Sequence, residues 1–248
     1  MEKDTFFIKR IRELADISYQ RDIVTFTDFL NLNEQNLVTM ERFPGITVEF
    51  YGGYDHAERV MAAFHPASVQ YEWEYPLTCL KIEARSRKFS EDLTHRDYLG
   101  AILNLGVDRS VTGDILVKNH TAWLFCHERI AGFLAENLLR VRHTEVTAEV
   151  SAGDMDIPEP ELVPVTGTCS SVRLDSLIAL AFQASRSSMV SYIESGLVFA
   201  NGKLITSNGY EPKEGDIISV RGKGRFIFDG AHGKTKKGRI SVRLLRYQ

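Results

Sequence analysis

The hydrophobic pattern is most regular in the last third of the chain, where it predicts two short helices and a hairpin. From residue 173 onward, apolar residues recur at i, i+3, i+4, i+7 and i+8, which is typical of a helix with one buried stripe. Ser171 is the candidate N-cap of this helix. A second helix is expected to begin at Ser185 and to end at Gly196. Asn201-Gly202 then separates two apolar runs and predicts a two-residue hairpin turn.

Alternating residues near the C-terminus predict a further pair of strands, over residues 225–228 and 239–244. The alternation places Arg239 and Arg243 on one face of the second strand and apolar side chains on the other. The loop between the strands carries several lysines, and we expect it to contact phosphate groups, although a hairpin tip of this kind can also be merely solubilising.

The middle of the chain predicts the order strand, helix, strand, strand, helix, strand. The strands are expected at residues 77–84, 113–117, 122–126 and 146–150, and the helices at 94–105 and 128–139. This order is that of a ferredoxin-like domain, which RNA-recognition modules share. The aromatic signature of those modules is missing, so the domain either binds RNA or only positions its neighbour.

The first 75 residues predict an N-terminal domain that mixes helices and strands. An amphipathic helix is expected over residues 3–20, a second helix over 33–43, a strand over 46–51 and a third helix over 55–64. We interpret Gly52-Gly53 as a tight turn from the strand into that third helix.

Two segments of the chain read as connections between domains. Residues 66–76 contain Tyr71, Trp73 and Tyr75, which are expected to pack onto a domain rather than to stack on bases. An acidic, proline-containing linker is expected over residues 153–161.

The charge of the chain changes sign at that linker. Residues 166–248 hold 13 Lys+Arg against 6 Asp+Glu, a net charge of +7, whereas residues 1–165 hold 17 against 27, a net charge of −10. Such asymmetry indicates that the C-terminal part binds nucleic acid. The acidic N-terminal part would then be repelled by RNA, and we expect it to dock protein partners.

Composition narrows the class of protein further. The chain has 248 residues, of which 44% are hydrophobic and 25% charged, as in an ordinary globular protein. We expect it to be cytoplasmic, with no membrane segment, because it lacks both a long apolar run and a secretory signal at its N-terminus. Cys79, Cys126 and Cys169 are widely spaced, so we expect neither a disulfide, nor a metal site, nor a cofactor.

The chemistry-bearing residues favour a protein without catalytic activity. The triplet His95-Arg96-Asp97 matches the catalytic loop of kinases, but the glycine-rich loop and the Asp-Phe-Gly motif are absent. Asp97 is better explained by a capping box with Thr94 at the start of a helix. The sequence also lacks the usual signatures of synthetases and methyltransferases. The alternative is an RNA-modifying enzyme, or its RNA-docking subunit, with an unrecognised catalytic site.

Four short motifs between residues 172 and 221 resemble the S4-type (alpha-L) RNA-binding domain in order and spacing. They are Arg173-Leu174-Asp175, Ser185-Arg186-Ser187, the run Gly196 to Lys203, and the run Gly215 to Val220. The resemblance implies that helix N-termini and arginines in these motifs face RNA. The candidate RNA-binding residues, including basic residues that follow the motifs, are Arg173, Ser185, Arg186, Ser187, Asn201, Lys203, Arg221, Lys223, Lys234, Lys236, Lys237 and Arg239.

The whole chain also resembles the YlmH-like family of bacterial S4-domain proteins. The supporting motifs are Thr27-Asp28-Phe29-Leu30, Tyr51-Gly52-Gly53-Tyr54 with Glu58-Arg59, the run Thr94 to Ala101, and the run Gly113 to Val117. The resemblance implies binding to ribosomal RNA and tRNA on a large ribosomal subunit that carries a stalled peptidyl-tRNA. It also implies a role in ribosome quality control and a link to cell division.

Together, these patterns predict an α+β chain of three domains. An N-terminal α/β domain spans residues 1–75, and a ferredoxin-like, RRM-like domain spans residues 76–152. An S4-type domain with a C-terminal β-hairpin spans residues 166–248. The RNA element that is bound is not specified by the sequence.

Overall fold

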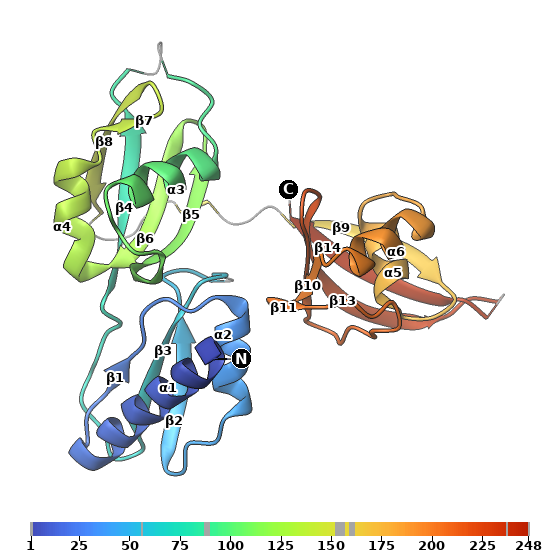
Figure 1. Ribbon diagram of the computed structural model, residues 1–248, viewed down its shortest axis with the longest axis horizontal. Coiled ribbons are helices and arrows are strands. Elements are labelled where there is room, and N and C mark those ends of the chain that lie inside the picture. The colour runs from blue at the N-terminus through green and yellow to red at the C-terminus, as the bar shows by residue number, and fades with distance from the viewer. Residues whose placement is uncertain are drawn as a thin grey trace. The chain divides into compact units, whose positions relative to one another are not determined.

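The chain folds into two compact units, residues 1–159 and 160–248, shown in Figure 1. Helices accompany sheets in both units, which confirms the α+β class. The computed structural model describes residues 2–55, 57–86, 90–151, 157–158, 162–236 and 238–247.

The first layer of the N-terminal unit is a three-stranded antiparallel sheet with the order β1-β3-β2. The side chains of Ile11, Leu14 and Phe64 form its core with their neighbours, because the apolar stripe of the first helix lies on this sheet. The second helix begins with a capping box between Asn31 and Glu34. The elements of this layer are α1 (Glu2–Arg21), β1 (Thr25–Phe26), α2 (Leu32–Met40), β2 (Ile46–Tyr51) and β3 (Met61–Pro66).

The third helix predicted for this layer, over residues 55–64, is wrong. Residues 61–66 instead form β3, the central strand of the sheet. Ala62 and Phe64 face α1, whereas Met61 packs against the neighbouring layer, so both faces of the strand are covered. A strand that is buried on both sides reads as a continuous apolar run, and such a run has no period that distinguishes a strand from a helix.

The second layer of the N-terminal unit is an antiparallel sheet with the order β5-β6-β4-β8-β7. If the four main strands β4, β5, β6 and β8 are numbered 1 to 4 along the chain, their order in the sheet is 2-3-1-4. This is the strand order of a ferredoxin-like domain, so the predicted plan is confirmed. Figure 1 shows its two helices on one face of the sheet. The capping box of Thr94 and Asp97 is confirmed. The elements are β4 (Leu77–Ala84), α3 (His95–Asn104), a 3-10 turn (Arg109–Val111), β5 (Thr112–Lys118), β6 (Thr121–His127), α4 (Glu128–Asn137), β7 (Arg140–Val141) and β8 (Thr144–Val150).

A buried carboxylate joins the two layers. Asp114 of β5 accepts hydrogen bonds from the Tyr54 hydroxyl at 2.8 Å and from the Glu58 backbone N–H at 2.7 Å. The Arg59 guanidinium donates to the backbone carbonyls of Thr112 and Phe29, both at 2.9 Å. Burial raises the pKa of Asp114, and the hydrogen bond from Tyr54 opposes that shift. The motifs that contain Tyr54, Arg59 and Asp114 therefore hold the layers together.

Gly52-Gly53 lies between two strands rather than before a helix, so the predicted strand-to-helix turn is corrected. Gly53 has a φ of +100°, and a methyl group on it would lie 2.3 Å from a ring carbon of Phe125. Glycine is thus required here by both the backbone conformation and the close approach of the second layer.

The segment that precedes β4 packs onto the first layer, as predicted for its aromatic residues. The rings of Trp73 and Tyr75 lie 5.7 Å and 5.5 Å from the ring of Phe26, centroid to centroid. Tyr71 is half exposed, and its hydroxyl accepts a hydrogen bond from the backbone N–H of Val24. The predicted linker, residues 153–161, lies outside the described residues except for positions 157 and 158.

The C-terminal unit is a six-stranded sheet with the order β11-β10-β12-β13-β14-β9, and α5 and α6 cover one of its faces (Figure 1). The core lies between the helices and this face and includes Leu177, Met189, Phe226 and Leu244. The elements are β9 (Leu162–Cys169), α5 (Leu174–Ala181), α6 (Arg186–Glu194), β10 (Val198–Ala200), β11 (Lys203–Leu204), β12 (Ile217–Val220), β13 (Gly224–Lys234) and β14 (Ile240–Tyr247).

Most of the predicted local signals in this unit are confirmed. Ser185 caps α6, Gly196 follows it with a φ of +70°, and Asn201 and Gly202 both have positive φ angles, as a type I′ turn requires. Ser171 is not the N-cap of α5, because Arg173 occupies that position. Strand β9 was not predicted, and it pairs with β14 over its whole length.

Candidate RNA-binding surface

The first turns of α5 and α6 bring two arginines to one buried carboxylate. Arg186, the first residue of α6, donates to one oxygen of Asp175 from Nε at 3.1 Å and from Nη2 at 2.5 Å. Arg173, at the N-cap of α5, approaches the other oxygen to 3.5 Å. The side chain of Asp175 is 4% exposed, whereas those of Arg173 and Arg186 are 40% and 51% exposed. The carboxylate therefore accepts hydrogen bonds from Arg186 and forms an ion pair with Arg173, whose Nη2 donates to the carbonyl of Asn208 at 3.3 Å. Both guanidinium groups stay partly exposed.

This arrangement suits the recognition of phosphate groups. A guanidinium has five N–H donors in a fixed plane, and Arg186 uses two of its nitrogens on Asp175. Arg186 is the first residue of α6, where backbone N–H groups of the first turn can also bind an anion. Two arginines and one aspartate leave a net charge of +1, so the group attracts an anion.

The serines at the start of α6 add exposed hydroxyl groups beside Arg186. The Ser185 hydroxyl accepts a hydrogen bond from the backbone N–H of Ser188 at 3.2 Å and shares a second one with the Ser187 hydroxyl at 3.1 Å. Both side chains are exposed. Serine hydroxyls are common donors to phosphate oxygens, so Ser185 and Ser187 extend the same surface.

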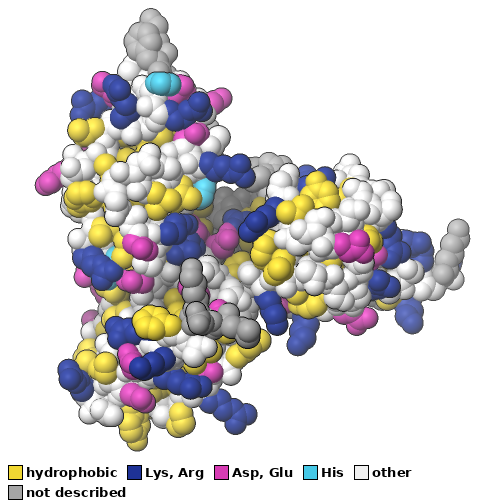
Figure 2. Space-filling model, in the orientation of Figure 1, with side chains coloured by type: hydrophobic (Ala, Val, Ile, Leu, Met, Phe, Trp, Pro, Cys, Tyr) yellow, Lys and Arg dark blue, Asp and Glu magenta, His cyan; other side chains and the backbone are white. Residues whose placement is uncertain are grey.

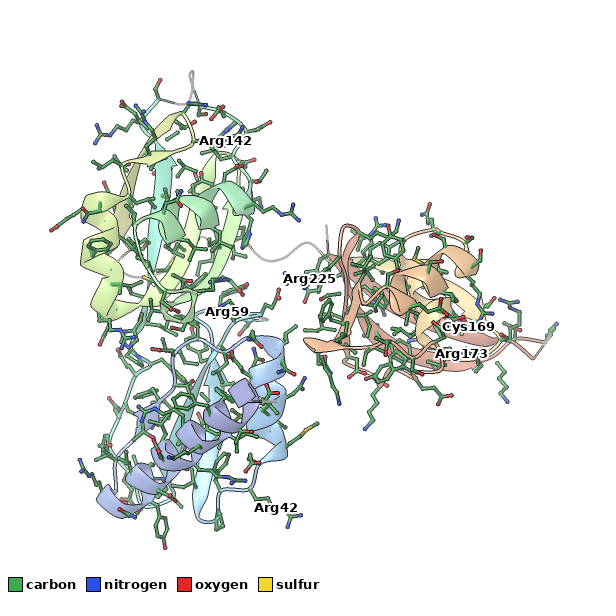
Figure 3. The ribbon with its side chains drawn as sticks, in the orientation of Figure 1. Arg42, Arg59, Arg142, Cys169, Arg173 and Arg225 are labelled. Carbon is green, nitrogen blue, oxygen red and sulfur yellow. The ribbon has the colours of Figure 1, made fainter. Side chains whose placement is uncertain are left out.

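Arg239, the residue before β14, contacts the edge strand β9. Its guanidinium donates to the Thr168 hydroxyl at 3.0 Å and to the Thr168 carbonyl at 2.7 Å. Burial raises the pKa of the Cys169 thiol, and the positive charges of Arg239 and Arg186 oppose that shift. Figure 3 labels Cys169 and Arg173 at the same end of the C-terminal unit. We call Arg173 and Arg186 the arginine cluster.

A second group of predicted residues lies around the turn that follows β12. The Arg221 guanidinium lies over the ring of Phe199, 5.0 Å from its centroid, and the Lys223 ammonium lies over the ring of Tyr192 at 5.2 Å. Lys203 is exposed on β11. The aromatic contacts of Arg221 and Lys223 do not involve the arginine cluster, so these residues form a second group.

The side chain of Asn201 forms hydrogen bonds within the domain. Its amide donates to Asp216 at 2.8 Å, and its carbonyl oxygen accepts from the backbone N–H of Ile217 at 2.9 Å. These contacts favour a role for Asn201 in shaping the hairpin turn rather than in direct contact with RNA.

The lysines of the β13–β14 hairpin form the third part of the predicted set. Lys234 and Lys236 are exposed, and Lys237 lies outside the described residues. On the side of the molecule shown in Figure 2, Lys and Arg side chains gather at the end of the C-terminal unit that carries this hairpin tip. Within the described residues, no carboxylate lies within 4.0 Å of the charged groups of Lys203, Arg221, Lys223, Lys234 or Lys236.

The sheet face on which RNA-recognition modules bind RNA is covered in the middle domain. Trp123 and Phe125 point from this face and pack against Phe29 and Met61 of the first layer. The ring of Tyr54 stacks on that of Phe125 with the centroids 4.9 Å apart and the planes 27° apart. The aromatic side chains of this face are therefore used to join the layers.

Asp175 was missed as a functional residue, although it lies in the motif that predicts Arg173. The sequence does show an acidic residue close to an arginine in the first turn of an apolar helix. An acidic residue at that position is usually explained by its favourable interaction with the helix dipole, so it did not indicate a functional role. Its contact with Arg186, 11 residues away, depends on the packing of α5 against α6.

Among the described residues there is neither a candidate metal site nor a membrane-spanning helix. No group of three or more His, Cys, Asp or Glu side chains there could hold a metal ion. Among the same residues, no helix has the length and the apolar character needed to cross a membrane.

Two parts of the chain match known families of RNA-binding domains. Residues 71–153 match the family described as the putative RNA-binding domain in YlmH, and residues 172–218 match the S4 domain. The chain is 32% identical over 241 residues to the ribosome-associated protein quality control protein P2 of Bacillus subtilis (strain 168), covering 95% of this chain and 92% of that protein. A solved structure, the cell division protein ylmH from Streptococcus pneumoniae, aligns with a TM-score of 0.50 and 24% identity over 61% of this chain and 93% of that one, and it supports the fold alone.

Proposed function

The chain belongs to the YlmH family of RNA-binding proteins, and we propose that it binds ribosomal RNA and tRNA on the large ribosomal subunit without catalysing a reaction. In this proposal it is a cytoplasmic factor of ribosome-associated quality control. The observation that carries the proposal is the pair of arginines held on Asp175 at two adjacent helix N-termini.

The physical basis of the proposed binding is electrostatic. Each phosphate that a lysine or arginine neutralises releases counterions, so affinity falls as salt concentration rises, with a slope of about −0.9 for each phosphate on a duplex. With one phosphate for each guanidinium group, the arginine cluster would contact about two phosphates. The net charge of +7 belongs to residues 166–248, which lie within the C-terminal unit, whereas RNA repels the acidic N-terminal unit. The protein would therefore bind with its C-terminal unit toward the RNA.

The finer parts of the proposal draw on the relatives. The name of the Bacillus subtilis relative refers to ribosome-associated quality control, and that of the Streptococcus pneumoniae protein refers to cell division. We extend both roles to this chain as proposals. The covered sheet face of the middle domain supports a role in which the N-terminal unit is a rigid body that docks protein partners.

Co-sedimentation of the full-length protein with purified ribosomal particles tests the proposal. Large subunits that carry peptidyl-tRNA, vacant large subunits and small subunits would each be centrifuged with the protein through a sucrose cushion. We expect the protein to pellet preferentially with the large subunits that carry peptidyl-tRNA, and Arg173→Ala to lower the bound fraction.

The matched control is Arg42→Ala, which removes an exposed arginine of the N-terminal unit, labelled in Figure 3. It makes the same change in charge and should bind like the unsubstituted protein. Equal binding to small and large subunits, or an equal loss in both variants, would contradict the proposal.

A further inference from the structure

The face of the C-terminal sheet that points away from α5 and α6 is built from apolar and aromatic side chains. Val198, Ala200 and Val220 point into the core, so their neighbours along the strands point to the other face. Residues that lie opposite each other in neighbouring strands share a face, and the register pairs Phe199 with Leu204. In the same way it places Ile217 opposite Ile227, and Ile227 opposite Leu245. We call this surface the outer sheet face.

Two arginines of this unit lie against aromatic rings. The Arg221 guanidinium lies 5.0 Å from the centroid of Phe199, and that of Arg225 lies 4.2 Å from the centroid of Tyr247. Guanidinium planes and aromatic rings are the two kinds of surface on which unpaired bases stack. Leu204, which is 49% exposed, extends the apolar surface beside Phe199.

The charge on the outer sheet face is positive. Arg243 forms an ion pair with Asp229 at 3.1 Å, so these two charges cancel. In the described part of the chain, no carboxylate lies within ion-pairing distance of Arg221. An aromatic and aliphatic face that carries the uncompensated charge of Arg221 is complementary to a strand that has both exposed bases and phosphates. A protein partner with an apolar surface would leave the Arg221 charge desolvated, which is costly.

The outer sheet face is distinct from the arginine cluster. Asp175, which holds the cluster, belongs to α5, and α5 packs on the opposite face of the sheet. Figure 3 labels Arg225 at one end of the C-terminal unit and Arg173 at the other. The two surfaces can therefore be perturbed separately.

We propose that the outer sheet face binds a single-stranded segment of RNA, whose bases stack on Phe199, Tyr247 and the guanidinium groups of Arg221 and Arg225. The inference rests on the proposed RNA-binding function and adds to it a second contact surface of different chemistry. The arginine cluster contacts the backbone, which single strands and duplexes share, whereas stacking requires unpaired bases.

The test compares single-stranded and double-stranded RNA. Fluorescence anisotropy would measure the affinity of the full-length protein for a labelled oligoadenylate, an oligouridylate and an RNA duplex of the same length. Phe199→Leu and Tyr247→Leu keep the apolar character but remove the aromatic face. We expect each to lower the affinity for the single strands about fivefold or more and the affinity for the duplex less than about twofold.

Two further variants keep the test interpretable. Arg221→Gln changes an exposed side chain and should also weaken single-strand binding without affecting folding. Phe133→Leu removes an aromatic ring of α4 that is 45% exposed in the N-terminal unit, and it should leave both affinities unchanged. Thermal unfolding of each variant would show that it is folded at the temperature of the assay.

Unchanged single-strand affinity in the folded Tyr247→Leu and Arg221→Gln variants would overturn the inference, as would equal losses on single strands and duplex. If Arg173→Ala weakens binding in the same assay while the outer-face variants do not, the inference fails and the proposed function stands. If the unsubstituted protein binds neither kind of RNA, both fail.

Discussion

Asp175→Asn is expected to weaken RNA binding even though it makes the binding surface more positive by one charge. Asparagine has nearly the same shape as aspartate, but a neutral acceptor replaces the carboxylate that holds Arg173 and Arg186. If Asp175 positions the arginines, its loss costs affinity. If it only neutralises charge, its loss improves affinity.

The expected magnitudes decide between these effects. Removing one negative charge several ångströms from a phosphate at a hydrated surface favours binding by about 0.3 to 0.6 kcal/mol. A hydrogen bond to a charged acceptor is stronger than one to a neutral acceptor by about 1 kcal/mol, and a released arginine must regain an ordering cost of up to about 2 kcal/mol. The loss exceeds the gain, and we expect affinity to fall roughly three- to tenfold.

The assay is fluorescence anisotropy with a labelled fragment of large-subunit ribosomal RNA, on full-length protein that circular dichroism shows to be folded. Asp16→Asn, at an exposed position of α1, is the matched control, because it makes the same change in charge away from the arginine cluster. It should bind as tightly as the unsubstituted protein or slightly more tightly. Tighter binding by Asp175→Asn would refute the positioning role.

Five further outcomes are expected. Arg186→Ala should reduce the steepness of the dependence of log affinity on log salt by about 0.7 to 0.9 on titration of the RNA complex, because one phosphate contact is lost; an unchanged slope would remove this arginine from the site. Gly53→Ala should lower the free energy of unfolding by about 2 to 4 kcal/mol in denaturant melts, because the methyl group would enter the Phe125 ring. Gly132→Ala, at an open position of α4, should instead raise it by about 0.5 to 1 kcal/mol. Burial raises the pKa of the Cys79 thiol to about 12, so between pH 7 and 9 a thiol reagent should modify it only as fast as the protein unfolds, and rapid labelling of the native protein would contradict this. Nucleoside mass spectrometry of ribosomes incubated with the protein should show no new modification, and a stoichiometric one would favour the alternative of an RNA-modifying enzyme.

Local sequence patterns correctly predicted the caps and turns that depend on residues close together in the chain. The capping box of Thr94 and Asp97, the Ser185 cap and the Asn201-Gly202 turn each depend on a few neighbouring residues, and all three are confirmed. The strand order of the middle domain follows from the order of its elements and the known plan.

The features that local patterns did not reveal depend on contacts between distant segments. Strand β3 is buried on both faces, so its apolar run resembles a helix. Strand β9 contains Pro164, which lacks an N–H group and weakens the strand signal; a proline is tolerated here because β9 lies at the edge of the sheet. The roles of Asp114 and Asp175 were hidden because their partners come from other elements.

In the proposed function, the C-terminal unit binds RNA of the large ribosomal subunit through the arginine cluster. Crosslinking in living cells, followed by sequencing of the attached RNA and identification of the crosslinked peptides, tests it most directly. We predict crosslinks to large-subunit ribosomal RNA and tRNA from peptides of residues 166–248, and their loss in a variant that combines Arg173→Ala with Arg186→Ala. Crosslinks mainly to messenger RNA, or crosslinks that persist in this variant, would contradict the account.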